Sequence, residues 1–394
     1  MSTPVQVSRP VQARRSRWWI VHHWAGVKLG LLLTFVLLTG TVATISNEID
    51  WMVRPALRVT PQDAPMASPA LWYAAALRVP GFTIEEVRAP IEAGFATQIE
   101  GTGADGEERI VYVDPWTGGV RGSGSADTVQ SVVRDLHRAL MLPTGVGVTF
   151  VSLLSVPLLL TLITAFKIYK RWWRGFRRLP RPMRDRRGEG RRWTGDLHRL
   201  AGVWSLWFVA LIGATGAWYL AEKLGAGTEE ARPPAASRAE AVPTPYEVQQ
   251  MIATARSVWP GFALKGLVID EGTVALEGQG QALLVRDRAN VLWFDTASGK
   301  LSKRADATSL GALGRLSEAA DPLHFGNWGG LASKIVWFAF GLILVALCVS
   351  GLVICALRLR SGGGALAALA RSMGAGAVLS IALVAYAIAK LACS

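Results

Sequence analysis

The chain of 394 residues is poor in cysteine and in charge. Three cysteines cannot build the disulfide framework of a small secreted domain. The chain has no C-x-x-C-H segment, which excludes a haem held through thioether bonds. Only 18% of the residues are charged, whereas 51% are hydrophobic, and this balance indicates a membrane protein rather than a set of soluble domains.

A nucleotide-binding fingerprint is also missing. Glycine-rich pieces such as residues 278–280 and 122–124 are too short and wrongly placed to cradle a phosphate. We therefore expect neither a flavin nor a nicotinamide site, and we find no catalytic triad. The formal net charge is +13, but the basic residues flank apolar runs, which is a pattern of membrane topology rather than of nucleic-acid binding.

Bases greatly outnumber acids between residues 167 and 192, where 12 bases face two acids. An excess of Lys and Arg marks cytoplasmic loops, so this segment should be cytoplasmic. Residues 47–136 and 222–323 carry 13 acids each and have the composition of soluble units, so they should lie on the outer side of the membrane. In the first of these, residues 68–79 predict a short helix, and residues 95–100 and 109–114 predict strands.

The apolar runs complete the predicted order. The pair Arg14-Arg15 before the first run could be a twin-arginine signal, but the run recurs later with its histidine and is better interpreted as a retained helix.

The predicted order is a cytoplasmic N-terminus (1–19), transmembrane helix 1 (20–46), a periplasmic unit (47–136), helix 2 (137–171), a basic cytoplasmic loop (172–195), helix 3 (196–221), a second periplasmic unit (222–323), helix 4 (324–357) and helix 5 (373–391).

The chain contains an internal duplication. Three positions of the first helix recur 176 residues later with the same residue types, and these are His22, Gly26 and Gly40, then His198, Gly202 and Gly216. His137 likewise recurs as His324, and the turn Asp114–Gly118 as Asp295–Gly299. Helix 5 has no counterpart in the first half.

The spacing of the repeated positions places them on one face of a straight helix. Four residues make about one turn and eighteen about five turns. A histidine on such a face can ligate a flat cofactor, and a glycine one turn further lets the cofactor lie close to the backbone.

The predicted topology sorts four histidines into two pairs. His22 and His198 begin helices that enter from the cytoplasm, whereas His137 and His324 precede helices that enter from the opposite side. Two neutral imidazoles can bind one haem iron from both sides and leave no open coordination position, which favours electron transfer. We therefore predict two haem b groups, with Gly40 and Gly216 near the outer one and small residues such as Gly351 near the inner one.

Other interpretations of these residues remain open at this stage. Histidines at a membrane edge can simply form hydrogen bonds with lipid headgroups or backbone carbonyls. Interpretation of the histidines as zinc ligands has less support, because structural zinc requires four ligands. His23 lies about 100° from His22 around the helix and could be the ligand instead. Lys28 could extend its amine to the membrane surface or pair with a haem propionate.

The sequence resembles the PepSY-associated transmembrane helix proteins. The resemblance rests on LHRLAGVWSLWFVALIGATG, on the Leu-His pairs at 136–137 and 323–324, and on the two Asp-x-x-[Thr/Ser]-Gly turns, and it covers residues 18–360. It implies a mainly α membrane protein, an internally duplicated bundle of four haem-binding transmembrane helices plus a fifth, with two small α+β PepSY-like periplasmic units. The first helix departs from the family pattern, since Val21-His22-His23 stands where the family has leucine, one histidine and a basic residue.

Within that family, the chain is similar to the inner-membrane di-haem ferric-siderophore reductases. This similarity implies an enzyme that takes electrons from quinol or a flavoprotein and passes them across the bacterial inner membrane to a ferric siderophore or another ferric chelate in the periplasm. Membrane lipid is the other expected partner, and nucleic acid is not expected. The alternatives are a cytochrome b subunit for another periplasmic reductase and a non-enzymatic PepSY binding or regulatory protein.

Overall fold

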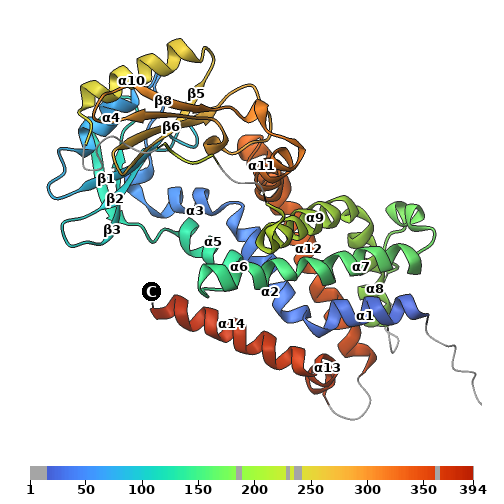
Figure 1. Cartoon of the computed structure of the whole chain (residues 1–394). Helices are drawn as coiled ribbons and strands as arrows, with labels where there is room; N and C mark the ends of the chain where they lie inside the picture. The colour runs from blue at the N-terminus through green and yellow to red at the C-terminus, as the bar shows by residue number, and fades with distance from the viewer. Residues whose placement is uncertain (1–15, 183–188, 228–230, 235–241, 360–363, 394) are drawn as a thin grey trace, which may run out of the picture. The chain divides into compact units, whose positions relative to one another are not determined.

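A computed structural model describes residues 16–182, 189–227, 231–234, 242–359 and 364–393 (Figure 1). The Arg14-Arg15 pair lies outside this part of the chain. The chain divides into two compact units, which we describe separately. We call them the helical unit (residues 1–34, 154–213 and 343–383) and the sheet-bearing unit (residues 35–153, 214–342 and 384–394).

The sheet-bearing unit contains one antiparallel sheet of eight strands, in the order β4-β3-β2-β1-β5-β6-β7-β8. The two soluble units of the sequence are the two halves of this sheet, and they join where Val87 of β1 lies opposite Leu267 of β5. The strands are β1 (Thr83–Arg88), β2 (Thr97–Thr102), β3 (Glu108–Val113), β4 (Val120–Ser125), β5 (Ala263–Asp270), β6 (Thr273–Gln279), β7 (Val291–Asp295) and β8 (Leu301–Ala305).

Strands β2 and β3 lie within two residues of the predicted runs, whereas β1 and β4 were missed. The sequence of β4, VRGSGS, carries two glycines, which are depleted in strands. It forms because β3 offers it a complete set of antiparallel partners at the edge of the sheet.

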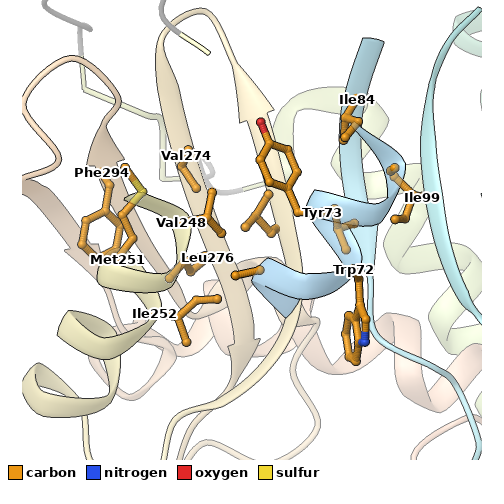
Figure 2. Packing of buried hydrophobic residues seen from close by; sticks show 14 of the residues in the cluster. Trp72, Tyr73, Ile84, Ile99, Val248, Met251, Ile252, Val274, Leu276 and Phe294 are labelled. Carbon is orange, nitrogen blue, oxygen red and sulfur yellow. The ribbon is translucent and has the colours of Figure 1, made fainter. Parts of the chain in front are cut away.

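Two helices, α4 (Pro69–Ala76) and α10 (Pro245–Val258), lie on the same face of the sheet and enclose its core (Figure 1). Figure 2 shows their apolar side chains pointing into one cluster with those of the strands. Tyr73 and Met251 come from the helices, and Ile99, Leu276 and Phe294 from the sheet, and each is less than 2% exposed. Burial of such a side chain contributes about 1.5–3 kcal/mol, so this layer fixes the sheet as one body.

The repeated turns have the same backbone in both halves. Gly118 and Gly299 have φ values of 69° and 66°, and their N–H groups donate to the carbonyls of Asp114 and Asp295 at 2.9 Å and 2.8 Å. The left-handed conformation favours glycine, which explains its presence at the fifth position of each turn.

The remaining α-helices include those that carry the apolar runs. They are α1 (Arg17–Lys28), α2 (Gly30–Ala43), α3 (Ser46–Val53), α5 (Val129–Ala139), α6 (Thr144–Leu153), α7 (Ser155–Ile168), α8 (Glu189–Trp204), α9 (Leu206–Ala221), α11 (Ala312–Phe325), α12 (Gly330–Arg358), α13 (Ala365–Met373) and α14 (Ala375–Cys393). Within the described residues, α12 and the α6–α7 run over Thr144–Ile168 are long and apolar enough to cross a membrane. If each bent pair, α1–α2 and α8–α9, counts as one span, there are four candidates.

The expectation of straight first and third helices is wrong. Helices α1 and α2 meet at 63° around Leu29, and α8 and α9 meet at 66° around Ser205. At the first bend, α14 packs so closely that a Cβ on Gly376 would lie 1.9 Å from the Lys28 carbonyl oxygen. At the second, the Ser205 hydroxyl donates to the Ala201 carbonyl at 2.7 Å, and such a bond bends helices.

The second and fourth histidines do not lie on the long apolar helices, as the predicted bounds 137–171 and 324–357 required. His137 belongs to α5, which is separated from α6 by two left-handed residues, Leu140 and Met141. His324 belongs to α11, which ends at Gly326 with a φ of 70°. A left-handed residue cannot continue an α-helix, so the apolar helices begin only afterwards, at Thr144 and Gly330.

Candidate functional site

The four repeat-matched histidines come together as two pairs, one in each unit. In the sheet-bearing unit, His137 of α5 faces His324 of α11, with ring centres 6.2 Å apart and planes 33° from parallel. In the helical unit, His198 of α8 lies within electrostatic range of His22 of α1. The sequence predicted this pairing from topology, and the tertiary structure forms it within each unit.

The spacing of the His137–His324 pair suits one shared metal ion. A metal–imidazole bond is about 2 Å long, so imidazoles that bind one ion from opposite sides have ring centres about 6 Å apart. The described residues contain no group of three or more His, Cys, Asp or Glu side chains that could hold an ion by themselves.

Each ring of this pair uses Nδ1 for a hydrogen bond inside the protein. His137 Nδ1 lies 2.8 Å from the Val36 carbonyl oxygen, and His324 Nδ1 lies 2.7 Å from Thr215 Oγ1. A carbonyl only accepts, so the proton of neutral His137 is on Nδ1 and the lone pair on Nε2. A metal-binding histidine commonly donates its other N–H in this way.

The pair in the helical unit is held by the same kind of bond. His22 Nδ1 lies 3.0 Å from the Thr161 carbonyl oxygen and 3.0 Å from Thr164 Oγ1. His198 Nδ1 lies 2.9 Å from Ser350 Oγ, whose own proton is donated to the Leu347 carbonyl. Because that hydroxyl proton is already used, the serine oxygen accepts from His198, and the lone pair of His198 is again on Nε2.

All four imidazoles therefore use Nδ1 for a hydrogen bond within the protein, and in His22, His137 and His198 the partner oxygen accepts, which leaves the lone pair on Nε2. Among the described residues, none of their Nε2 atoms has a hydrogen-bond partner. Sequence analysis missed Thr164, Thr215 and Ser350, because a hydroxyl within an apolar helix is common and usually bonds its own helix.

Two glycines lie directly against these rings. A Cβ on Gly40 would lie 2.6 Å from His137 Cε1, and a Cβ on Gly351 would lie 3.4 Å from His198 Cε1. Gly26 and Gly202 instead face aliphatic atoms at 3.7 Å and 3.6 Å, which is ordinary contact. Gly216 is buried in α9 beside Thr215.

His23 and Lys28 have other roles in the fold. The His23 ring stacks on Trp19 with centres 5.0 Å apart and planes 9° from parallel, which favours His22 over His23 as the ligand. Lys28 Nζ donates to the carbonyl of Ser372 at 2.7 Å, so it stabilises the last turn of α13. This bond is neither of the two arrangements expected for Lys28.

A polar surface lies on the sheet face opposite the core. On β1, Glu86 and Arg88 alternate with Val87, which is buried in the core. The Arg88 guanidinium forms ion pairs with the carboxylates of Glu86 and Glu100, at N–O distances of 2.7 Å and 3.3 Å. Burial, followed by repulsion from Glu86, raises the pKa of Glu277 to about 7. No sequence pattern predicted this group, because the register of β1, β2 and β6 brings its members together.

Comparison with known proteins places the chain in a family. Residues 19–358 match the model of the PepSY-associated TM region. The chain belongs to the PepSY-associated transmembrane family. It is also 28% identical over 246 residues to a Pseudomonas aeruginosa protein named "Uncharacterized protein PA4219". That match covers 55% of this chain and spans 61% of the relative's length. Membership in the PepSY-associated family agrees with the candidate membrane helices and with the sheet.

Proposed function

We propose that this PepSY-associated protein is a di-haem b oxidoreductase of the bacterial inner membrane, which passes electrons to a ferric siderophore or a similar ferric chelate in the periplasm. The observation that carries the proposal is that His22, His198, His137 and His324 all have Nδ1 held by the protein, which in the first three leaves the lone pair on Nε2 and in His137 and His324 goes with a ring spacing that suits one shared ion.

Iron porphyrin fits these residues. Each pair supplies two neutral imidazoles, and a porphyrin supplies the equatorial nitrogens that the described protein lacks. Gly40 and Gly351 lack a Cβ where the His137 and His198 rings lie, which lets one imidazole of each pair pack directly against a helix backbone. When bound, each haem would supply a one-electron couple with no open coordination position.

Backbone carbonyls and hydroxyl groups of this chain would then orient the histidines that hold the cofactors. The Val36 and Thr161 carbonyls orient His137 and His22, and the Thr215 and Ser350 hydroxyls orient His324 and His198. A fixed ring orientation and a more basic Nε2 strengthen the bond to iron and lower the rearrangement that accompanies electron transfer.

The proposed direction of electron flow rests on the charge pattern. The basic segment 167–192 favours a cytoplasmic position for the loop of the helical unit, so electrons from quinol or a flavoprotein would enter at the His22–His198 pair. They would leave from the His137–His324 pair, which belongs to the same unit as the sheet. Reduction weakens the hold of a siderophore on iron, because hard oxygen ligands favour the smaller, more charged ion.

The decisive experiment measures haem and its oxidation by iron. The purified protein should contain about two low-spin haems b per chain in a reduced-minus-oxidised spectrum. After anaerobic reduction, a ferric siderophore added with a ferrous trap should reoxidise the haems and form the ferrous complex. Haem-free protein would refute the proposal and favour a binding or regulatory role. Reoxidation by a protein partner but by no ferric chelate would favour a cytochrome b subunit.

Orientation is tested independently by labelling. In a cysteine-free background, Ser123→Cys on exposed β4 should react with an impermeant maleimide in intact spheroplasts. Arg178→Cys, in the basic segment, should react only after the membrane is disrupted. The opposite result would reverse the direction of electron flow.

A further inference from the structure

The residue that follows His198 carries buried hydrogen-bond donors without acceptors. Arg199 lies on α8 with only 22% of its side chain exposed. Its Nε and Nη2 atoms are buried and have no hydrogen-bond partner among the described residues. Each buried donor left without an acceptor costs about 1–3 kcal/mol, and more when the group is charged.

The nearby carboxylate does not satisfy this guanidinium. Asp196 Oδ1 lies 3.0 Å from Arg199 Nη2, which makes an ion pair by distance, but the N–H is not directed for a hydrogen bond. The other oxygen, Oδ2, lies 3.4 Å from the backbone nitrogen of Arg181 and 3.8 Å from its Nε. One carboxylate therefore serves two arginines, and positive charge remains in excess beside His198.

The Nε and Nη2 atoms of Arg199, which lack a hydrogen bond among the described residues, form the edge through which arginine binds carboxylates. In the same protein, Arg286 holds Glu318 with Nε on one carboxylate oxygen and Nη2 on the other. Two parallel N–H donors match the two oxygens of a carboxylate, and such a bidentate pair is among the strongest polar contacts in proteins. Arg199 has the same two donors without a hydrogen bond among the described residues, although Nη2 is ion-paired with Asp196, and it is one residue from a proposed iron ligand.

We infer that Arg199 binds a propionate carboxylate of the haem held by His22 and His198. This inference rests on the proposed function and assigns a residue for holding the cofactor that the histidines alone do not identify. The anionic headgroup of a phospholipid has similar chemistry, and the experiment below separates the two sources.

The test compares Arg199→Gln with Arg192→Gln in purified holoprotein. Both changes remove one arginine charge from α8, but Arg192 is exposed and pairs with Glu189 at 3.2 Å. Loss of a charged bidentate contact should make one of the two haems transfer to apomyoglobin about tenfold faster or more. The same haem should have a lower midpoint potential, because the guanidinium stabilises the ferrous form and the substitution removes that stabilisation. Arg192→Gln should change neither quantity.

Two further measurements identify the anion and guard against misfolding. Arg199→Lys keeps the charge but loses the bidentate edge, so it should restore most of the potential and still release haem faster. Reconstitution with iron protoporphyrin dimethyl ester, which lacks free carboxylates, should raise the haem transfer rate of the wild type to that of Arg199→Gln, and the substitution should then not accelerate transfer further.

The outcomes separate the inference from the proposed function. Two haems in both proteins, with unchanged potentials and transfer rates in Arg199→Gln and Arg199→Lys, would overturn the inference and leave the function intact. The inference also fails if the substitution still accelerates haem transfer in the dimethyl ester protein, since a lipid headgroup would then be the partner. Absence of haem from the wild type would overturn both.

Discussion

The two histidine pairs are built in different ways. The His137–His324 pair lies on α5 and α11, two helices that end in left-handed residues just after the histidine. The His22–His198 pair lies within α1 and α8, which continue for at least one further turn after the histidine and then bend, at Leu29 and at Ser205. Yet both pairs direct Nδ1 into the protein. The comparison shows that the two pairs share the hydrogen-bonded orientation of the ring and not the shape of the helix that carries it.

The largest expected effect is loss of one haem with each histidine. His137→Ala or His324→Ala should remove one haem, and His22→Ala or His198→Ala the other, because an axial ligand is lost. Haem quantitation and redox titration of the remaining haem check this. The haem that remains after substitution of His137 or His324 should have a different midpoint potential from the haem that remains after substitution of His22 or His198. His23→Ala is the control and should retain both haems. If all four variants keep both haems, the histidines are not ligands.

A smaller effect is expected at the glycines, and it sharpens the contrast between the pairs. Gly40→Ala would place a Cβ 2.6 Å from His137 Cε1, so the ring must move, whereas Gly26→Ala meets only Thr161 Cγ2 at 3.7 Å. We expect Gly40→Ala to lose or perturb one haem, visible as a reduced or shifted α band, and Gly26→Ala to leave the spectrum unchanged. Equal effects of the two would show that steric contact with the ring is not what matters.

Removal of the hydroxyls should weaken haem binding without abolishing it. Ser350→Ala and Thr215→Val each remove the partner of one Nδ1 atom, and such changes typically cost about 10- to 100-fold in metal affinity. Haem transfer to apomyoglobin measures the loss. Thr149→Val is the control, since its hydroxyl bonds only the Gly145 carbonyl of its own helix. Transfer as slow as in the wild type would mean that these bonds do not hold the ligands.

The smallest effect concerns the sheet alone. The raised pKa of Glu277, about 7, means that the folded protein keeps this proton at pH values where the unfolded chain has lost it. Stability should therefore fall as pH rises from about 4.3 to 7, by about 1–3 kcal/mol. Tryptophan-fluorescence melts at pH 5 and pH 8 test this. Glu277→Gln should flatten the difference, and exposed Glu107→Gln should not. An unchanged pH dependence in Glu277→Gln would place its origin in another group.

The sequence predicted the parts of this protein that repeat. Two copies of a histidine with glycines at the same spacing, and two copies of the Asp–Gly turn, can be read without coordinates, because a helix face and a turn depend on a few neighbouring residues. Composition and charge likewise indicated the membrane helices. Membership in the PepSY-associated family, which the match over residues 19–358 establishes, was predicted from the same motifs.

Only the tertiary structure decided how these parts combine. The bend at Leu29 depends on Gly376, more than 300 residues away, and the tautomer of His198 depends on Ser350. The two soluble units became one sheet because β1 and β5 satisfy each other's backbone groups. Only the positions of Asp196 and Arg181 show that the Nε and Nη2 donors of Arg199 lack a hydrogen bond among the described residues. The local sequence pattern indicated which residues are candidate ligands. Contacts between residues far apart in sequence determined which nitrogen atoms of those residues are hydrogen-bonded, because hydrogen bonds and packing are completed only in the folded chain.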